Sequence, residues 1–271
     1  MSNRFPTLYI PHGGGPCFFM DPMPGMPPDL WNKMAAYLRG ISASLPARPD
    51  AIVVISAHWE AARPTVSQVL RHSLLFDYYG FPEHTYRLTY PAHGSPALAQ
   101  KVRELLAQAA IECDFDASRG IDHGVFIPFK LIFPEADVPM VPLSLRHDLN
   151  ANAHLAIGAA LAPLREQGVL IVGSGMSYHN LRELFRQDER ANEAARQFDQ
   201  WLATTVALAD GAQRAQALVD WQRAPGALAS HPRAEHLLPL MVAAGAASND
   251  PGRIAYADIL LGKPLSAVQF G

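Results

Sequence analysis

Histidine is the residue type in this chain whose number and spacing could do chemistry. The 271 residues include eleven histidines. Three of them, His12, His58 and His179, follow short apolar runs of the kind that form strands. Neutral imidazole is the commonest protein ligand of first-row divalent metals, and three such ligands leave positions open for substrate or water. The pattern predicts a catalytic metal site, although any one histidine could instead cap a helix or bond in a turn.

Short β-branched runs alternate with longer amphipathic runs along the chain, which predicts an α/β fold. We expect a single domain over residues 1–271, with a mostly parallel mixed central sheet and helices on both faces. The predicted strands cover 7–11, 51–57, 65–70, 138–145, 169–173 and 253–260. The predicted helices cover 29–45, 96–110, 150–166, 192–209, 212–222 and 233–246. Because the carboxyl ends of parallel strands meet at one edge, the three histidines should gather there.

Composition and charge exclude several classes of function. A net charge of −3 with scattered Lys and Arg argues against a nucleic-acid partner and favours a small ligand. The chain has no apolar run of the roughly 18 residues that a membrane span needs, and its first residues lack the apolar core of a signal peptide. We therefore expect a soluble, cytoplasmic protein. Cys17 and Cys113 form no Cys-x-x-Cys pair, which argues against a disulfide framework or a thiolate zinc site.

Other motifs near the histidines are incomplete. The run Gly13–Gly15 lacks the Gly-Lys-Ser/Thr ending of a phosphate-binding loop, and Ser174 and Ser177 lack the Gly-x-Ser-x-Gly pattern of a hydrolase elbow. Glycines after His12 would instead let the backbone approach a metal and substrate closely. Two segments rich in Pro, Gly and aromatic residues, 16–28 and 74–94, are predicted to be ordered functional loops or lids.

Five ordered motifs together resemble one known family. They are Pro11-His-Gly-Gly-Gly15, Ser56-Ala-His-Trp-Glu60, Asp122-His-Gly124, Tyr178-His-Asn-Leu181 and His231-Pro-x-x-Glu-His-x-x-Pro-Leu240. The chain resembles the class III extradiol ring-cleavage dioxygenases, the superfamily of the protocatechuate 4,5-dioxygenase beta subunit. Within it the chain is most similar to the 4,5-DOPA dioxygenase-like branch. The resemblance spans residues 7 to about 262.

The resemblance implies a ferrous ion held by His12, His58 and His236, with zinc as the metal that the purified protein could carry instead. Glu235 competes with His236 for the third place. Residues adjacent on a helix point about 100° apart, so only one of this pair should face the ion, and we favour the histidine.

Two further histidines receive roles from the same resemblance. His179 is expected beside the metal as the acid–base residue, and it could itself ligate zinc in the empty enzyme. His123 is expected to line the pocket and contact dioxygen or a catechol oxygen. Asp122 could accept the ring N–H of His123 or could simply cap the following helix.

The predicted substrate contacts are Trp59, Tyr178, His231 and Phe126, although Trp59 and Tyr178 could equally pack in the core. The chain departs from the family in two places. Phe126 stands where the family commonly has Trp, and Ala234 stands where it commonly has Pro. Both departures leave the metal ligands intact and affect the shape of the pocket.

The implied activity is non-haem Fe(II)-dependent extradiol cleavage of a catechol, DOPA-like or related, with both atoms of O2 inserted to give a muconic semialdehyde-type product. The partners are then a small catechol and O2, and the protein should be a monomer or a small homo-oligomer. Two alternatives stay open: a zinc-dependent hydrolase using the same histidines, and a non-catalytic ligand-binding member of the fold.

Overall fold

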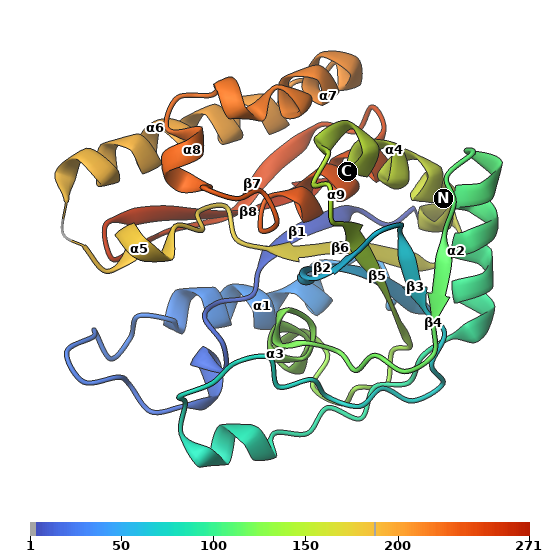
Figure 1. The fold of residues 1–271 in the computed structure, drawn as a ribbon, viewed down its shortest axis with the longest axis horizontal. Helices are drawn as coiled ribbons and strands as arrows, with labels where there is room; N and C mark the ends of the chain where they lie inside the picture. Colours follow the sequence, from blue (N-terminus) through green and yellow to red (C-terminus); the bar gives the residue numbers. More distant parts are fainter. Residues whose placement is uncertain (1–3, 187) are drawn as a thin grey trace.

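One mixed sheet organises the protein, which was analysed as a computed structural model describing residues 4–186 and 188–271. Within these residues, eight strands form the order β4-β3-β5-β2-β6-β1-β8-β7 (Figure 1). They are β1 (Thr7–Pro11), β2 (Ala51–Ala61), β3 (Thr65–Ser67), β4 (Asp114–Asp116), β5 (Met140–Arg146), β6 (Val169–Gly175), β7 (Gly252–Leu260) and β8 (Lys263–Phe270). The central strands β5, β2, β6 and β1 are parallel, whereas β3 and β8 pair antiparallel to their inner neighbours.

The central strands are apolar on both sides because both faces of the sheet are covered. Along β2, Val53 and Ile55 face one hydrophobic cluster, and Ile52 and Val54 face the other. This alternation follows from the two-residue period of a strand. Helices α2 (Pro96–Gln108), α4 (Ala151–Leu161), α6 (Glu189–Val206) and α9 (Leu238–Ala247) cover the first face. Helices α1 (Asn32–Ser44) and α3 (His123–Ile132) cover the second (Figure 1). The predicted α/β class, with a mixed sheet between helical layers, is confirmed.

The helices agree with most of the predicted ranges. They are α1 (Asn32–Ser44), α2 (Pro96–Gln108), α3 (His123–Ile132), α4 (Ala151–Leu161), α5 (Leu181–Leu184), α6 (Glu189–Val206), α7 (Gly211–Val219), α8 (Ala227–Ser230) and α9 (Leu238–Ala247). Helices α4 and α9 pack closely because a glycine in each leaves room for the other's backbone. A β-carbon on Gly158 would lie 2.1 Å from the Val242 carbonyl oxygen. None of the helices in the described ranges is long and apolar enough to cross a membrane.

Four differences from the sequence predictions lie at the edges of the fold. Strand 65–70 ends at Ser67, and β4 and β8 were not predicted. Strand β8 pairs with β7 through a tight turn at Leu261 and Gly262, both of which have positive φ. The Pro in Lys263-Pro264-Leu265 concealed this strand, because proline is rare inside sheets. Helix 233–246 begins only at Leu238, because the preceding residues form a turn that leads into the helix.

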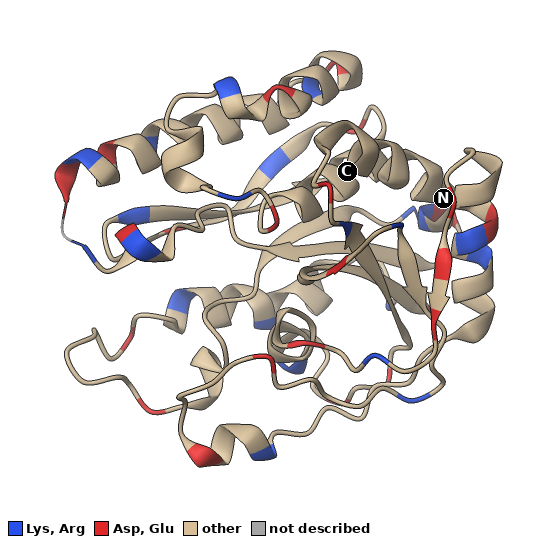
Figure 2. Cartoon of the chain, viewed as in Figure 1, with Lys and Arg blue, Asp and Glu red and all other residues tan. Residues whose placement is uncertain are grey.

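Charged residues of both signs are interspersed along the outer helices (Figure 2). On α6, for example, Arg196 lies 2.8 Å from the Glu193 carboxylate. Basic residues are thus scattered over the folded chain as they are in the sequence, and on α6 Arg196 pairs with both Glu189 and Glu193 at exposed positions.

Candidate metal centre

The three predicted metal ligands converge from distant segments. His12 directly follows β1, His58 lies in β2, and His236 lies in the turn before α9. Ring centroids lie 4.8 Å apart for His12 and His58, 5.2 Å for His12 and His236, and 4.9 Å for His58 and His236. The three rings are therefore close neighbours in the folded chain.

Two more imidazoles complete the cluster. His123, the first residue of α3, lies 4.1 Å from His58 and 5.2 Å from His12 between ring centroids. His179 follows β6 and stacks on His236, with centroids 3.3 Å apart. The structure therefore brings together all five histidines to which the resemblance gave metal or catalytic roles.

Each of the three proposed ligands has its Nδ1 beside an oxygen. Nδ1 of His12 is 2.9 Å from the Gly13 carbonyl oxygen, Nδ1 of His236 is 3.0 Å from Glu235 Oε1, and Nδ1 of His58 is 3.7 Å from Asp77 Oδ2. The Nε2 atoms of His12 and His58 lie 3.3 Å apart, and Nε2 of His236 is buried without a hydrogen-bond partner. When Nδ1–H donates to an oxygen, Nε2 keeps its lone pair for a metal. Among the described residues, the possible metal-ligand atoms that lie within 4.8 Å of one another form two neighbouring groups, His12, His58 and His123 in one and His179, Glu235 and His236 in the other.

Burial keeps these three rings uncharged. Desolvation, with neighbouring imidazoles adding to it, lowers the pKa of His12 well below its usual 6.5 and the pKa of His58 to about 2. Desolvation also lowers the pKa of His236 to about 3, although Glu235 opposes the shift. A metal ligand must be deprotonated, so near neutral pH the rings are already in the form that binds an ion.

Asp77 orients His123, a role that the sequence analysis gave to Asp122. Both the backbone N–H and Nδ1 of His123 donate to Asp77 Oδ1, at 3.0 and 2.8 Å. Burial alone would raise the pKa of Asp77, but the hydrogen bonds from His123 outweigh it and hold the pKa below its usual value. Asp77 comes from the predicted loop 74–94, which a hydrogen bond of 2.8 Å from Leu75 N to Ile121 O fixes beside His123.

Asp122 does not orient His123, so the first alternative for it was wrong. Its side chain accepts hydrogen bonds from Ser56 Oγ at 2.6 Å and from the Arg119 guanidinium at 3.1 Å. It makes no side-chain capping bond to α3, although it occupies the N-cap position. Asp122 therefore links the start of α3, where His123 lies, to Ser56 of β2.

Glu235 contacts two rings of the cluster. Its Oε1 lies 3.0 Å from Nδ1 of His236 and 3.3 Å from Nδ1 of His179. Burial would raise the pKa of Glu235, but hydrogen bonds from His179 and His236 hold it far below its usual value. The helical argument for choosing between Glu235 and His236 was wrong, because the pair lies in a turn where both side chains reach the cluster.

A cavity of about 380 Å³ opens over the histidines. Tyr178 lines it, as predicted, together with glycines 13–15 and the five imidazoles. Residues of both predicted functional loops also line it, notably Met23 and Phe81, which the sequence analysis did not single out. In the sequence, the aromatic residues of those loops were the feature that could have indicated their place in the cavity lining.

The other three predicted substrate contacts lie outside the cavity lining. Trp59 follows His58 on a strand, so it points to the opposite side, where the Arg119 guanidinium lies 5.3 Å from its ring. Phe126 is fully buried against Phe76, at a centroid distance of 5.6 Å. His231 is also fully buried, with Nε2 2.8 Å from the Ser177 carbonyl oxygen. These three predictions are corrected to core-packing roles.

Comparison with known proteins places the chain in a family. Residues 6–262 match the family described as the catalytic LigB subunit of aromatic ring-opening dioxygenase. A 4,5-DOPA dioxygenase extradiol of Beta vulgaris is 40% identical over 75% of each chain, and one of Escherichia coli is 35% identical over 90% of this chain and 86% of its own. The dioxygenase tasH of Hapsidospora irregularis is 36% identical over 98% of this chain and 85% of its own.

A solved structure agrees with the sequence comparison. The crystal structure of an uncharacterized protein from Escherichia coli K12 superposes with a TM-score of 0.77 at 31% identity, covering 99% of this chain and all of that one. The chain therefore belongs to the family of extradiol aromatic ring-opening dioxygenases.

Proposed function

We propose that residues 1–271 form one catalytic domain that uses Fe(II) to cleave a catechol beside its two hydroxyl groups. Both atoms of O2 enter the product, a muconic semialdehyde. The observation that carries this proposal is the convergence of His12, His58 and His236, each with Nδ1 beside an oxygen and Nε2 available. Zinc suits the same nitrogens and is the metal that we expect to compete with iron.

When bound, the ferrous ion supplies a Lewis acid with open positions at which a catechol and O2 can meet. The protein side chains then determine how the ring is held and how protons move. Glycines 13–15 line the cavity without side chains, so a flat ring can lie close to the histidines. Tyr178 contributes an aromatic wall beside them.

His179 is the proposed acid–base residue. Its Nδ1 is held near the Glu235 carboxylate, which leaves Nε2 to take a proton from a catechol hydroxyl and return it later in the reaction. His123, fixed by Asp77, is proposed to contact dioxygen or a catechol oxygen. Both rings line the cavity, so both can reach a bound substrate.

Relatives named 4,5-DOPA dioxygenase extradiol make DOPA the reference catechol for a test. The purified protein is reconstituted with Fe(II) without oxygen and then given catechols and a measured amount of O2. We expect a yellow ring-cleavage product with one O2 consumed per product. A zinc-loaded sample serves as the control and should consume no O2. Hydrolysis by that sample, with no O2 uptake by the iron-loaded protein on any catechol, would favour the hydrolase alternative.

A further inference from the structure

The cavity has a second zone, beyond the histidines, that is apolar. Among the described residues, no Lys, Arg, Asp or Glu lines the cavity. The other polar side chains of the lining, Cys17, Tyr178 and Asn180, carry no charge, although the buried Tyr178 hydroxyl has no hydrogen-bond partner. Burial raises the pKa of the Cys17 thiol and raises the pKa of Tyr178 to about 12, so both stay neutral. The Asn180 amide already donates to the Ala229 carbonyl oxygen at 2.7 Å.

Three segments build this apolar zone. The hairpin of β7 and β8 contributes Leu260 and Leu265, and the end of α5 contributes Leu184. At the mouth, Leu181 and Phe185 also line the cavity although they are 59% and 56% exposed. Large exposed apolar side chains at a cavity mouth commonly mark a surface that a ligand covers. The apolar lining thus continues from the interior to the rim.

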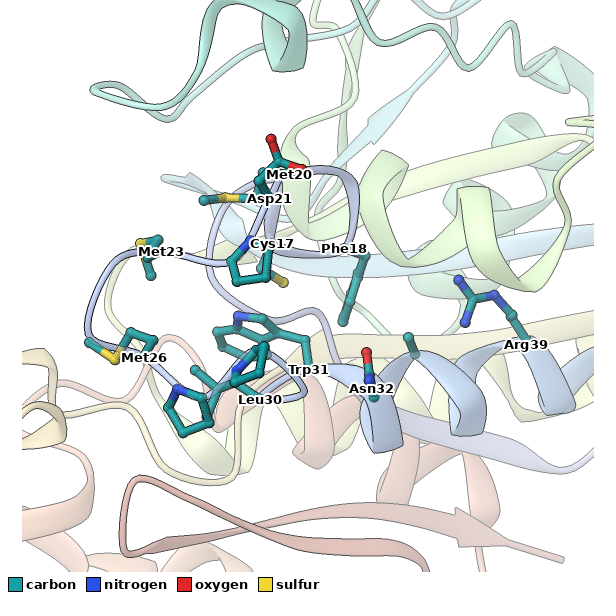
Figure 3. A pocket seen from close by; sticks show the side chains of 14 residues that line it. Cys17, Phe18, Met20, Asp21, Met23, Met26, Leu30, Trp31, Asn32 and Arg39 are labelled. Atoms are coloured by element: carbon teal, nitrogen blue, oxygen red, sulfur yellow. The ribbon is translucent and has the colours of Figure 1, made fainter.

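The third segment is a loop rich in methionine. A neighbouring pocket of about 180 Å³ shares Met20, Met23 and Trp31 with the cavity and adds Met26 (Figure 3). Methionine adapts its shape to different apolar partners. Two charged residues also line this pocket: Asp21 lies beside Met20, and Arg39 lies at the opposite end from Met23 and Met26 in Figure 3. Both are exposed, and neither lines the larger cavity. The residues that the two pockets share are apolar or uncharged, and two of them are methionines.

We infer that the preferred substrates are catechols with an uncharged, apolar substituent, which the apolar zone receives while the diol faces the histidines. This inference rests on the proposed function and narrows its substrate class. A zwitterionic side chain such as that of DOPA would place an ammonium and a carboxylate among leucines, where neither would regain the hydration it loses. An alkyl chain in the same place buries apolar surface and gains from it.

The test compares substrates on the iron-loaded full-length protein by initial rates of O2 uptake. Catechol, 4-butylcatechol, DOPA and 3-(3,4-dihydroxyphenyl)propionate are the probes. We expect kcat/KM for 4-butylcatechol to exceed that for catechol, DOPA and the propionate by about tenfold or more, because a butyl chain buries several methylene groups. If DOPA or the propionate matches 4-butylcatechol, the inference is overturned while the proposed function stands. If the protein cleaves none of the four, the proposed function fails and the inference falls with it.

Matched variants test whether the cavity mouth determines the preference for apolar substituents. Leu181→Arg places a cation at the cavity mouth, whereas Leu228→Arg places one at a leucine that is 58% exposed in another four-residue helix, α8, outside the lining. Because both positions are exposed, neither change should disturb the core. We expect Leu181→Arg to lower the ratio of kcat/KM for 4-butylcatechol over that for the propionate by about tenfold, and Leu228→Arg to leave it unchanged. Phe185→Arg repeats the first test at a second rim position. An unchanged ratio in both rim variants would overturn the inference.

Discussion

The histidine cluster divides into two halves, each with a carboxylate that contacts two rings. Glu235 contacts His236, a proposed ligand, and His179, the proposed acid–base residue. On the other side Asp77 lies against His123 and more loosely against His58. The Glu235 half is local, because the carboxylate is adjacent in sequence to one of its partners. Asp77 stands 46 residues before His123 and depends on the folded loop.

The distances suggest that the two carboxylates matter to different degrees. Glu235 lies 3.0 Å from the Nδ1 of a proposed ligand, whereas the corresponding distance from Asp77 to His58 is 3.7 Å. An oxygen that accepts the Nδ1–H of a ligand fixes its ring and strengthens metal binding. Glu235 should therefore affect the metal strongly, and Asp77 should act mainly through His123.

Loss of a proposed ligand should have the largest effect on iron content and turnover. The effect should be similar whichever of the proposed ligands is removed. His12→Ala and His236→Ala each remove one of three ligands, so we expect iron content near zero and turnover down on the order of a thousandfold or more. Metal analysis and O2 uptake measure these effects. His147→Ala, at an exposed histidine outside the cluster, is the control and should keep both values. Full iron content in His236→Ala would show that this ring is not a ligand.

His179→Ala should separate proton transfer from metal binding. Removal of a general acid–base group costs on the order of a hundredfold or more in turnover, and we expect iron content to stay near that of the unmodified protein. Stopped-flow measurement of product formation, with metal analysis of the same sample, checks this. Undiminished turnover would refute the role, and loss of iron would show that His179 is a ligand.

Glu235→Gln should weaken metal binding, because the variant keeps the shape of the side chain but loses the charge that holds two rings. We expect a ten- to hundredfold loss of Fe(II) affinity. Asp77→Asn is the matched change in the other half and should alter Fe(II) affinity by less than about threefold while lowering kcat about tenfold. Competition with a chelator gives the affinities. Equal losses of affinity in the two variants would contradict the distinction between the halves.

His231→Phe should have the smallest effect on catalysis. The ring lies outside the cavity, so we expect KM and kcat to stay within about twofold. The variant leaves the buried Ser177 carbonyl oxygen without its partner, which should lower the free energy of unfolding by about 1–3 kcal/mol. Thermal unfolding and steady-state kinetics measure the two effects. A large rise in KM with unchanged stability would restore His231 to the substrate site.

The sequence predicted the parts of the site that are tied to local pattern. Apolar runs predicted the strands that carry His12 and His58, and five motifs identified the histidines of the cluster. The predicted strand 51–57 ended before His58, so the two-residue period was not applied to His58 and Trp59, which lie within β2. The sequence also could not show that Asp77 rather than Asp122 orients His123. The Asp77 relation depends on the contact between Leu75 and Ile121, which tertiary packing sets. Strand β8 was missed because its proline contradicted the local strand preference.

The central claim is that one metal ion binds between three segments of the chain. Anomalous diffraction at the iron edge from a crystal of the Fe(II)-loaded protein tests it directly. The account predicts one strong peak at about 2.0–2.2 Å from Nε2 of each of His12, His58 and His236. A peak bonded to only one of these rings, or two separate peaks on opposite halves of the cluster, would contradict it.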